Sequence, residues 1–435
     1  MADIAAVRPA SRMSFGGWSS QLVLWGSLAL ALMIAPQVFS SSAAVSLLSQ
    51  LGTLVIFCLS YNMLLGEGGM YSFGHAAYSG LGAYFAIHAM NMAAHGKFYI
   101  PVWLIPLVGG IAGMVFGILF GYLTTRKAGT AFAMITLGVV ELVHASSEMF
   151  PGFFGGEGGV ETNRNYGTGF FGMTFGPQIR VYYLIVAWLL LSAIAMYALT
   201  RTPLGRITNA VRDNPERAQF VGYDPKTVRF FTLVLSAFFA GISGGLQAIN
   251  MELITSESVS SLRSADAMIF TFIGGAQAFF GPIVGVIIGG FLSFKLSDYT
   301  QAWQLYLGVF FILIVMYAPG GVSGILLSNW RVIRAGLFGR VAGRWSAVVC
   351  AGAMIALAGA ALVELSYGFV FGSEKGAVVN YVRALDKSMQ GVIWGTAILI
   401  FAGGIFLLQR LIPPFKEAWN DVSSRVHLMN SGDGA

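Results

Sequence analysis

Long apolar stretches without charged residues alternate with short polar segments along most of the chain. No Asp, Glu, Lys or Arg lies between Arg12 and Glu67, which leaves room for two apolar helices near Gln21–Phe39 and Ala44–Leu65. A helix of about 20 apolar residues crosses a bilayer. The same pattern predicts further spans at Ser72–Ala94, Tyr99–Leu123, Thr130–Met149, Val181–Leu199, Phe230–Asn250, Trp303–Tyr317, Trp345–Gly372 and Gly391–Leu408.

One further apolar run, Ala267–Phe294, is interrupted at Gly281-Pro282. Proline removes a helical hydrogen bond, so we interpret this run as two short helices joined by a turn. The pattern therefore predicts an all-α polytopic membrane protein with about twelve membrane segments, some of them broken or re-entrant.

The composition excludes most other classes of protein. Of the 435 residues, 56% are hydrophobic and only 10% are charged, whereas soluble domains are about a quarter charged. A soluble enzyme, a disordered chain and a coiled coil are all excluded. Cys58 and Cys350 both lie in apolar runs, so we expect neither a structural disulfide nor a metal site on them.

The basic residues predict the orientation. With both termini in the cytoplasm, 17 of the 25 Lys and Arg residues fall on the cytoplasmic side, as membrane proteins prefer. We expect a cytoplasmic tail at residues 1–20, a transmembrane core at 21–327 with a cytoplasmic loop at 201–229, and a C-terminal extension at 328–435. The extension adds two apolar spans and a polar tail.

The sequence offers little support for chemistry within this chain. A phosphate-binding loop needs Gly-Lys followed by Ser or Thr, but only Lys97 follows a glycine, and Phe98 comes next. Glu141 and His144 lie at helical spacing, as in di-iron bundles, but a second such motif is missing. We expect them to be a polar pair packed inside the bundle and predict no metal. Glu148 lies at the edge of the same span, and the other ionisable residues within predicted spans are His75, His88 and Glu364.

Glycines divide into two patterns. Some repeat every four residues and predict close helix crossings, namely Gly109, Gly113, Gly117 and Gly121, then Gly281, Gly285 and Gly289, then Gly241 and Gly245. Others are dense in the segments 66–75 and 274–282, where we predict interrupted helices that line a transport cavity.

The loop at 201–229 carries the signals of a short helix. Asn214 is suited to cap it, Pro215 to occupy its first position and Glu216 its first turn, while Gly222 can end it. We expect a second short helix before it. These internal caps favour a rigid docking element over an ordinary solvated loop.

Four motifs in order resemble the permease subunits of bacterial branched-chain amino acid ABC importers, the LivM-like type more than its LivH-like partner. They span Val45 to Leu327. The matching stretches are Tyr61–Ala77 with Gly80, Gly82, Ala83 and Tyr84, then Thr202–Arg206 with Ala210–Asn214, then Ile273–Gly275 with Gly281-Pro282, and Tyr317–Gly321.

The resemblance implies a coupling role for the cytoplasmic loop. Glu216, Ala218 and Gly222 keep the spacing of the Glu-Ala-Ala-x3-Gly signature of ABC permeases, although Arg217 replaces its first alanine. We expect contact with the ATPase through Arg206, Arg212, Asn214, Pro215, Glu216, Arg217, Ala218 and Gly222. Because polar groups avoid lipid, we predict a translocation path lined by some of Asn62, Ser72, His75, Thr136, Glu141, Gly274 and Gly275.

The resemblance also implies an assembly in the bacterial inner membrane. Its expected partners are a LivH-like permease or a second copy of this chain, two ATPase subunits that bind ATP and Mg, and a periplasmic solute-binding protein. The expected solute is a branched-chain amino acid, with urea, short amides and small carboxylates as alternatives. The extension could be a structural addition, a regulatory element or a contact with another subunit.

Two other functions stay open from the residues alone. An ion-coupled secondary transporter would use Glu141 and His144 as a proton relay. An integral membrane enzyme would place the same two residues in its active site.

Overall fold

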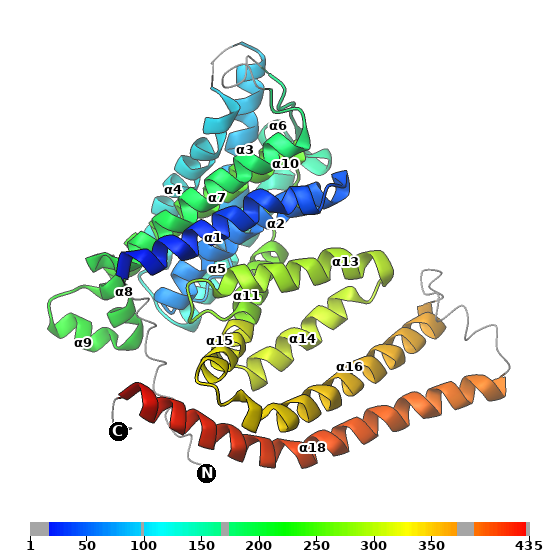
Figure 1. Ribbon diagram of the computed structural model, residues 1–435. Helices are drawn as coiled ribbons and strands as arrows, with labels where there is room; N and C mark the ends of the chain where they lie inside the picture. The colour runs from blue at the N-terminus through cyan, green and yellow to red at the C-terminus, as the bar shows by residue number, and fades with distance from the viewer. Residues whose placement is uncertain (1–16, 97–99, 167–173, 372–386, 432–435) are drawn as a thin grey trace.

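The computed structural model describes residues 17–96, 100–166, 174–371 and 387–431 and is helical almost throughout (Figure 1). Residues 1–16, most of the predicted N-terminal tail, lie outside this part of the chain, as do residues 167–173 of the loop after β1. Every predicted membrane segment corresponds to a helix or to a continuous group of helices.

The first half of the chain forms seven long helices and several short elements. In order these are α1 (Gly17–Val38), α2 (Ser42–Asn62), the π-helix η1 (Met63–Glu67), α3 (His75–Ala94), η2 (Val102–Leu104), α4 (Ile105–Thr124), α5 (Thr130–Met149), α6 (Pro151–Phe154), η3 (Gly156–Gly158), β1 (Val160–Glu161), α7 (Gln178–Arg201), α8 (Pro203–Asp213), α9 (Pro215–Phe220) and α10 (Pro225–Met251).

The second half is built from shorter helices and ends in a long hairpin. It contains β2 (Leu253–Ile254), η4 (Ser256–Val259), α11 (Ser261–Gly274), α12 (Gly281–Gly285), η5 (Val286–Gly290), α13 (Phe291–Tyr299), α14 (Trp303–Tyr317), α15 (Gly321–Arg334), η6 (Phe338–Arg340), α16 (Ala342–Phe371) and α18 (Lys387–Ser431).

Eight helices of the described chain are long and apolar enough to cross a membrane, or nine if α14 and α15, bent by 51°, count as one span. The sequence predicts twelve segments because it also counts α1, α3 and α11. The apolar part of α1 and the whole of α11 are short. α3 is 20 residues long but carries His75, His88 and Asn91, which lower its hydropathy.

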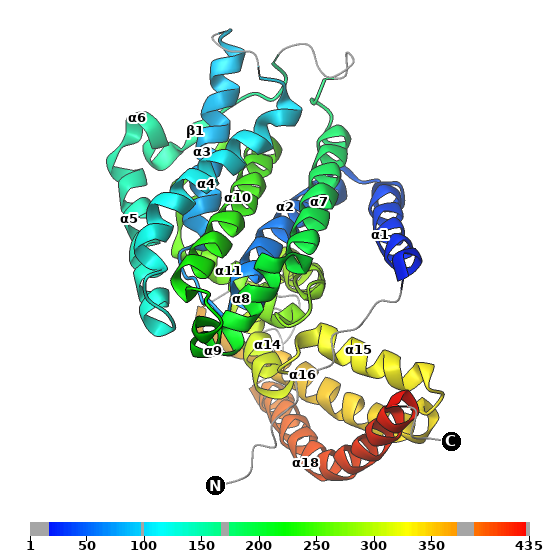
Figure 2. The same cartoon turned by 90° about the vertical axis from the view of Figure 1, so that its left-hand side faces the viewer.

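The centre of the fold is α10, which packs against α2, α3 and α4 (Figure 2). The predicted glycine seam is confirmed here. A Cβ on Gly241 would lie 2.2 Å from the carbonyl oxygen of Gly109, and one on Gly113 would lie 2.4 Å from that of Ala237. The Ser236 and Ser243 hydroxyls donate to the carbonyl oxygens of Ser60 and Thr53, at 2.6 and 2.7 Å.

Both predicted helix interruptions are present, but the second one lies earlier than expected. α11 ends at Gly274, Gly275 adopts a φ of 106°, and α12 starts at Gly281. Pro282 therefore lies in the first turn of α12, where a proline costs no hydrogen bond, rather than in the turn itself.

The bundle has two distinct ends. Figure 2 shows α6 and β1 at one end and α8 and α9 at the other. At the first end β1 pairs with β2 in antiparallel register, with Val160 opposite Ile254. The Arg164 guanidinium donates to the carbonyl oxygens of Ile249 and Asn250 there, which ties this loop to the end of α10.

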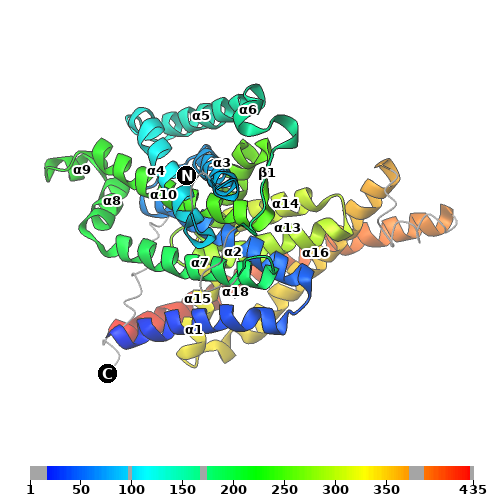
Figure 3. The same ribbon diagram turned by 90° about the horizontal axis from the view of Figure 1, so that it is seen from above.

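The C-terminal extension is a helical hairpin, and it projects from the bundle when seen from above (Figure 3). α16 lies along α18, which continues as a helix through Pro413 and Pro414 to Ser431. The predicted polar tail is thus helical as far as it is described. The Tyr306 hydroxyl on α14 donates to Glu364 Oε1 on α16 at 2.9 Å.

Candidate functional site

The two short helices predicted in the loop at 201–229 are present as α8 and α9. Thr202 caps α8, and Asn214 Oδ1 accepts the Arg217 N–H at 2.9 Å to cap α9. Gly222 ends α9 with a φ of 94°, and the Tyr223 N–H donates back to the carbonyl oxygen of Ala218. The predicted start and stop of this helix are confirmed, and Pro215 and Glu216 lie in its first turn.

The next helix is capped as well. Asp224 accepts hydrogen bonds from the Thr227 hydroxyl at 2.7 Å and from the N–H groups of Lys226 and Thr227 at the start of α10. These bonds, the one from the Thr227 hydroxyl first, hold the pKa of the Asp224 carboxyl below its ordinary value. The segment from 202 to 227 is therefore fixed by its own caps.

The elbow formed by α8 and α9 has a packed inside and an exposed tip. Val211, Ala218 and Val228 form a small buried cluster that holds the two helices together. At the tip, Phe220 is 90% exposed and Val221 is 71% exposed. The charged side chains predicted to meet the ATPase, Arg206, Glu216 and Arg217, are also exposed. The elbow is a stiff projection with a mixed apolar and charged surface.

α8 is bonded directly to the first helix interruption. The Asn209 amide donates to Glu67 Oε2, and the Arg212 guanidinium donates to the carbonyl oxygen of Gly66. Gly69 adopts a φ of 63°, and a Cβ there would lie 2.7 Å from Cγ of Arg212. We call this set of contacts, between Asn209 and Arg212 on α8 and residues 66–69, the latch.

Sequence reasoning assigned Arg212 to the ATPase contact and missed the latch. A signal was available, because Glu67 is the only acidic residue between Asp3 and Glu141. An isolated acid at the end of an apolar span needs a partner, and α8 carries the donors.

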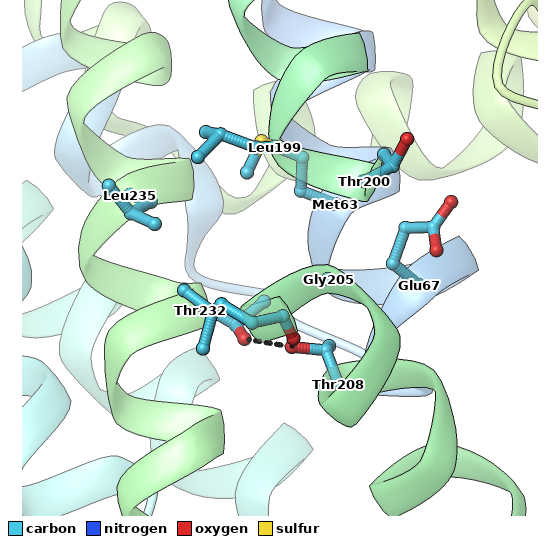
Figure 4. Close-up of a pocket in the computed structure, with 9 residues that line it drawn as sticks. Met63, Glu67, Leu199, Thr200, Gly205, Thr208, Thr232 and Leu235 are labelled. Atoms are coloured by element: carbon cyan, nitrogen blue, oxygen red, sulfur yellow. Dashed lines mark hydrogen bonds between the residues drawn. The ribbon is translucent and has the colours of Figure 1, made fainter. Parts of the chain in front are cut away.

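A small open pocket lies beside the latch (Figure 4). It is lined by Met63, Glu67, Leu199, Thr200, Leu204, Gly205, Thr208, Thr232 and Leu235. Across it, the hydroxyls of Thr208 and Thr232 share a hydrogen bond of 3.0 Å between α8 and α10. α8 is therefore held by polar bonds, with unfilled space between it, α7 and α10.

Most of the predicted path residues lie inside the bundle. Ser72, His75 and Thr136 are each at most 1% exposed, and Asn62 is 2% exposed. His75 Nε2 lies 2.9 Å from the Ser60 hydroxyl, and its ring stacks on Phe57. These side chains do not reach a cavity open to the outside of this subunit in the state described.

Of these polar groups, the Thr136 hydroxyl is satisfied by hydrogen bonds, whereas Asn62 Oδ1, Ser72 Oγ and His75 Nδ1 have no partner among the described residues. The Thr136 hydroxyl accepts the Phe73 N–H at 3.2 Å and donates to the carbonyl oxygen of Ala133. Gly274 and Gly275 are close-packing points, since a Cβ on either would lie within 2.1 Å of a backbone oxygen. His88 is similarly occupied, with Nε2 2.7 Å from the carbonyl oxygen of Phe153.

The expectation of a packed Glu141–His144 pair is wrong. Glu141 is exposed on α5, and His144 instead lies 3.8 Å from Glu148 and 3.2 Å from the carbonyl oxygen of Ser256. The reason is that α5 lies at the edge of the bundle and buries its other face. Within the described chain, no three His, Cys, Asp or Glu side chains come together as a metal site would require.

Comparison with known proteins identifies a family. A family model described as a branched-chain amino acid transport system permease component matches residues 43–319. The high-affinity branched-chain amino acid transport system permease protein LivM of Escherichia coli K12 is 26% identical over 319 residues, covering 67% of this chain and 73% of that protein.

More distant relatives cover a similar part of the chain. The probable branched-chain amino acid transport permease protein LivH of Methanocaldococcus jannaschii is 24% identical and covers 65% of this chain and 90% of its own length. The ribose import permease protein RbsC of Haemophilus influenzae is 21% identical, over 67% of this chain and 89% of its own length. No solved structure gives a significant match.

Proposed function

This chain belongs to the family of branched-chain amino acid transport system permease components, and from that premise we propose that it moves branched-chain amino acids by alternating access. Family membership makes it a multi-pass protein of the bacterial inner membrane and a permease component of an ABC importer for small solutes. Relatives named as ribose and fructose import permeases belong to the same wider group, so the choice of solute is part of the proposal.

The observation that carries the coupling mechanism is the latch between α8 and the end of η1. The exposed α8–α9 elbow would dock on an ATPase subunit, whose ATP-driven closure moves the elbow. Because α8 holds residues 66–69 through Asn209 and Arg212, this motion reaches the first helix interruption.

The interruption in turn touches α11. Tyr71, which follows the latch, stacks on Phe272 of α11 with ring centres 6.3 Å apart and an angle of 18° between the planes. The Thr271 hydroxyl next to it donates to the carbonyl oxygen of Cys58 on α2. A continuous set of contacts therefore joins the docking elbow to the short helix α11, and rigid-body motion along it is the proposed coupling route.

The proposed assembly has three kinds of partner. A LivH-like permease completes the membrane part, two ATPase subunits supply ATP and Mg binding, and a periplasmic protein delivers the solute. We propose that both termini lie in the cytoplasm. With this orientation α8 and α9 are cytoplasmic and the β1–β2 pair is outside, in line with the basic residues at 201–229.

The test is copurification of the tagged chain from its own host, with mass spectrometry to identify the proteins that come with it. We expect both ATPases and one second permease to copurify, and the reconstituted complex to hydrolyse ATP faster when the loaded binding protein is added. A chain that purifies alone and takes up solute with an ion gradient but without ATP would refute the ABC assignment.

A further inference from the structure

Three charged side chains gather at the start of α11, on a face that the sequence analysis did not single out. Arg263 and Asp266 lie one turn apart on α11, and Glu257 lies on the preceding η4. Both acids interact electrostatically with the Arg263 guanidinium. We call Glu257, Arg263 and Asp266, with the neighbouring Leu262, the charged face.

The charged face lies within the membrane-spanning part of the bundle. The Arg263 guanidinium lies 5.5 Å from the ring centre of Phe57, a fully buried residue of α2. It also donates to the side chain of Gln247 on α10. α2 and α10 are both long enough to cross the membrane, so Arg263 lies between two spans. Its Nε is buried without a hydrogen-bond partner among the described residues.

The position of α11 is fixed by the core. The Ala76 N–H, at the start of α3, donates to the Ser264 hydroxyl at 2.9 Å. Ser260 caps the helix, and a Cβ on Gly80 would lie 2.6 Å from the carbonyl oxygen of Ser258. The short α11 thus begins inside the bundle, with its first turn held against α3.

The two acids nevertheless lie on the outside of this subunit. Glu257 and Asp266 are exposed, and Leu262 between them is 71% exposed. Charged side chains at membrane depth are costly against lipid and are found facing water-filled cavities or opposite charges. One arginine and two acids give this face a net negative charge, which favours a cationic group over an anionic one.

We propose that the charged face is this subunit's contribution to the solute path and that it binds the ammonium group of a zwitterionic solute through Glu257 and Asp266. This inference rests on the proposed transport function and names the group that the path recognises. Arg263 balances one of the two acids and, packed on Phe57, sets their position. The chain of contacts from the latch through Tyr71 to Phe272 ends on the same helix, so docking motions reach this site.

The test is thiol labelling of Leu262→Cys in the assembled complex, with Cys350→Ser to remove the exposed native cysteine. Cys58 is fully buried and is kept. The modification rate is measured with two methanethiosulfonate reagents, one carrying a cationic trimethylammonium group and the other an anionic sulfonate group. Each rate is divided by the rate at which the same reagent reacts with glutathione. We expect the cationic reagent to be favoured by about tenfold, because the negative face concentrates cations.

Two sets of variants make this result specific. Adding Asp266→Asn and Glu257→Gln should abolish or reverse the preference for the cationic reagent, since Arg263 is then the only charged side chain left on the charged face. Leu119→Cys, on a 62% exposed position of α4, is the control for a lipid-facing site and should react with neither reagent.

Three results would overturn the inference. One is a Leu262→Cys site as unreactive as Leu119→Cys, and another is equal normalised rates for both reagents. The third is a site that reacts in the chain expressed alone and becomes silent in the complex, which would mean that the acids pair with a partner subunit. The assembly itself is judged by copurification, so a complex that forms normally while the labelling fails would refute this inference and leave the importer proposal standing.

Discussion

The central helix α10 and the C-terminal hairpin are both apolar, with mean hydropathies of 1.6 and 2.2, but they are used in opposite ways. In α10, 83% of the most apolar window is buried within the subunit, against 11% in α16 and 11% in α18. α10 carries small residues at its contacts, such as Gly241 and Gly244, whereas the hairpin turns large residues outward. Leu357 is 74% exposed and Leu399 is 72% exposed.

This difference shows what holds a membrane bundle together. Lipid tails are as apolar as leucine, so burying a leucine between helices gains little in a bilayer. Close backbone contact and hydrogen bonds give the association its strength, and α10 has both through its glycines and serines. The hairpin lacks such a seam over most of its surface, so its outward leucines and valines suit lipid or another subunit.

The largest effect should follow from filling the glycine seam. A Cβ on Gly241 would lie 2.2 Å from the carbonyl oxygen of Gly109, and backbone cannot move aside as a side chain would. We expect Gly241→Val to abolish the accumulation of folded protein, since overpacking costs about 1–3 kcal/mol or more even where side chains can adjust. Size-exclusion chromatography in mild detergent measures the folded fraction.

The matched control is Gly352→Val on α16, where nothing lies within 4 Å of the added Cβ. This variant should run as wild type. Equal loss of folded protein in both variants would contradict the conclusion that α10 depends on close backbone contact and the hairpin does not.

The next effect concerns the latch, which links the core to the docking elbow. Arg212→Ala removes the bond to the Gly66 carbonyl oxygen, and a bond to a charged group contributes about 1.5–3 kcal/mol. We expect solute uptake to fall by about tenfold or more, because 1.4 kcal/mol corresponds to a factor of ten. The ATPases should still copurify, because the exposed tip of α9 is unchanged.

Uptake by whole cells and copurification of the ATPases with the tagged chain measure these two outcomes separately. Lys127→Ala, an exposed cation in the turn after α4, is the control and should leave uptake unchanged. Normal uptake by the Arg212 variant would remove the latch from the coupling route.

The sequence predicted those parts of the fold that depend on local rules. The spans follow from apolar length, the α8–α9 elbow from Asn214, Pro215 and Gly222, and the α4–α10 seam from glycines four residues apart. Each of these signals acts within one helix or at one helix end. These features could therefore be predicted without knowing which helices pack against each other.

The parts that were missed depend on which elements lie side by side. Glu141 was expected inside the bundle, but nothing in the sequence shows that α5 lies at its edge. The latch joins residues 146 positions apart, Gly66 and Arg212, and Arg263 lies in the first turn of α11, before the apolar run that was predicted to start at Ala267. Long-range pairings of this kind leave only indirect signals, such as the isolated acid Glu67.

A smaller effect is expected from removing the hairpin. A chain that ends at Gly336 loses α16 and α18 but keeps the residues matched by the family model, 43–319. It also loses the packing of Val332 on α15 against Val341 and Val422. We expect normal insertion and uptake within about twofold of wild type, with a lower Tm from the lost contacts, each large side chain being worth about 1.5–3 kcal/mol when buried in water-soluble proteins.

Uptake per folded molecule and thermal unfolding in detergent measure the two quantities. A truncated chain that folds but no longer copurifies with its partners would show that the hairpin is an assembly surface, and its outward leucines would then face protein.

The smallest effect should come from the hydrogen bonding of the Tyr306 hydroxyl, which links α14 of the core to α16 of the hairpin. Tyr306→Phe leaves the ring in place but removes the contacts of the hydroxyl with Glu364 Oε1, at 2.9 Å, and with the carbonyl oxygen of Ala360, at 3.2 Å. Hydrogen bonds between membrane helices contribute about 0.6 kcal/mol on average, because the separated helices find other partners. The coupling energy between Tyr306→Phe and Glu364→Gln in a double-mutant cycle, measured by reversible unfolding in detergent, should therefore lie near this value, with uptake unchanged. A coupling energy of zero would mean that the hairpin is free of the core at this point. A value above about 2 kcal/mol would exceed what such bonds contribute in membranes and would place the hairpin with the core.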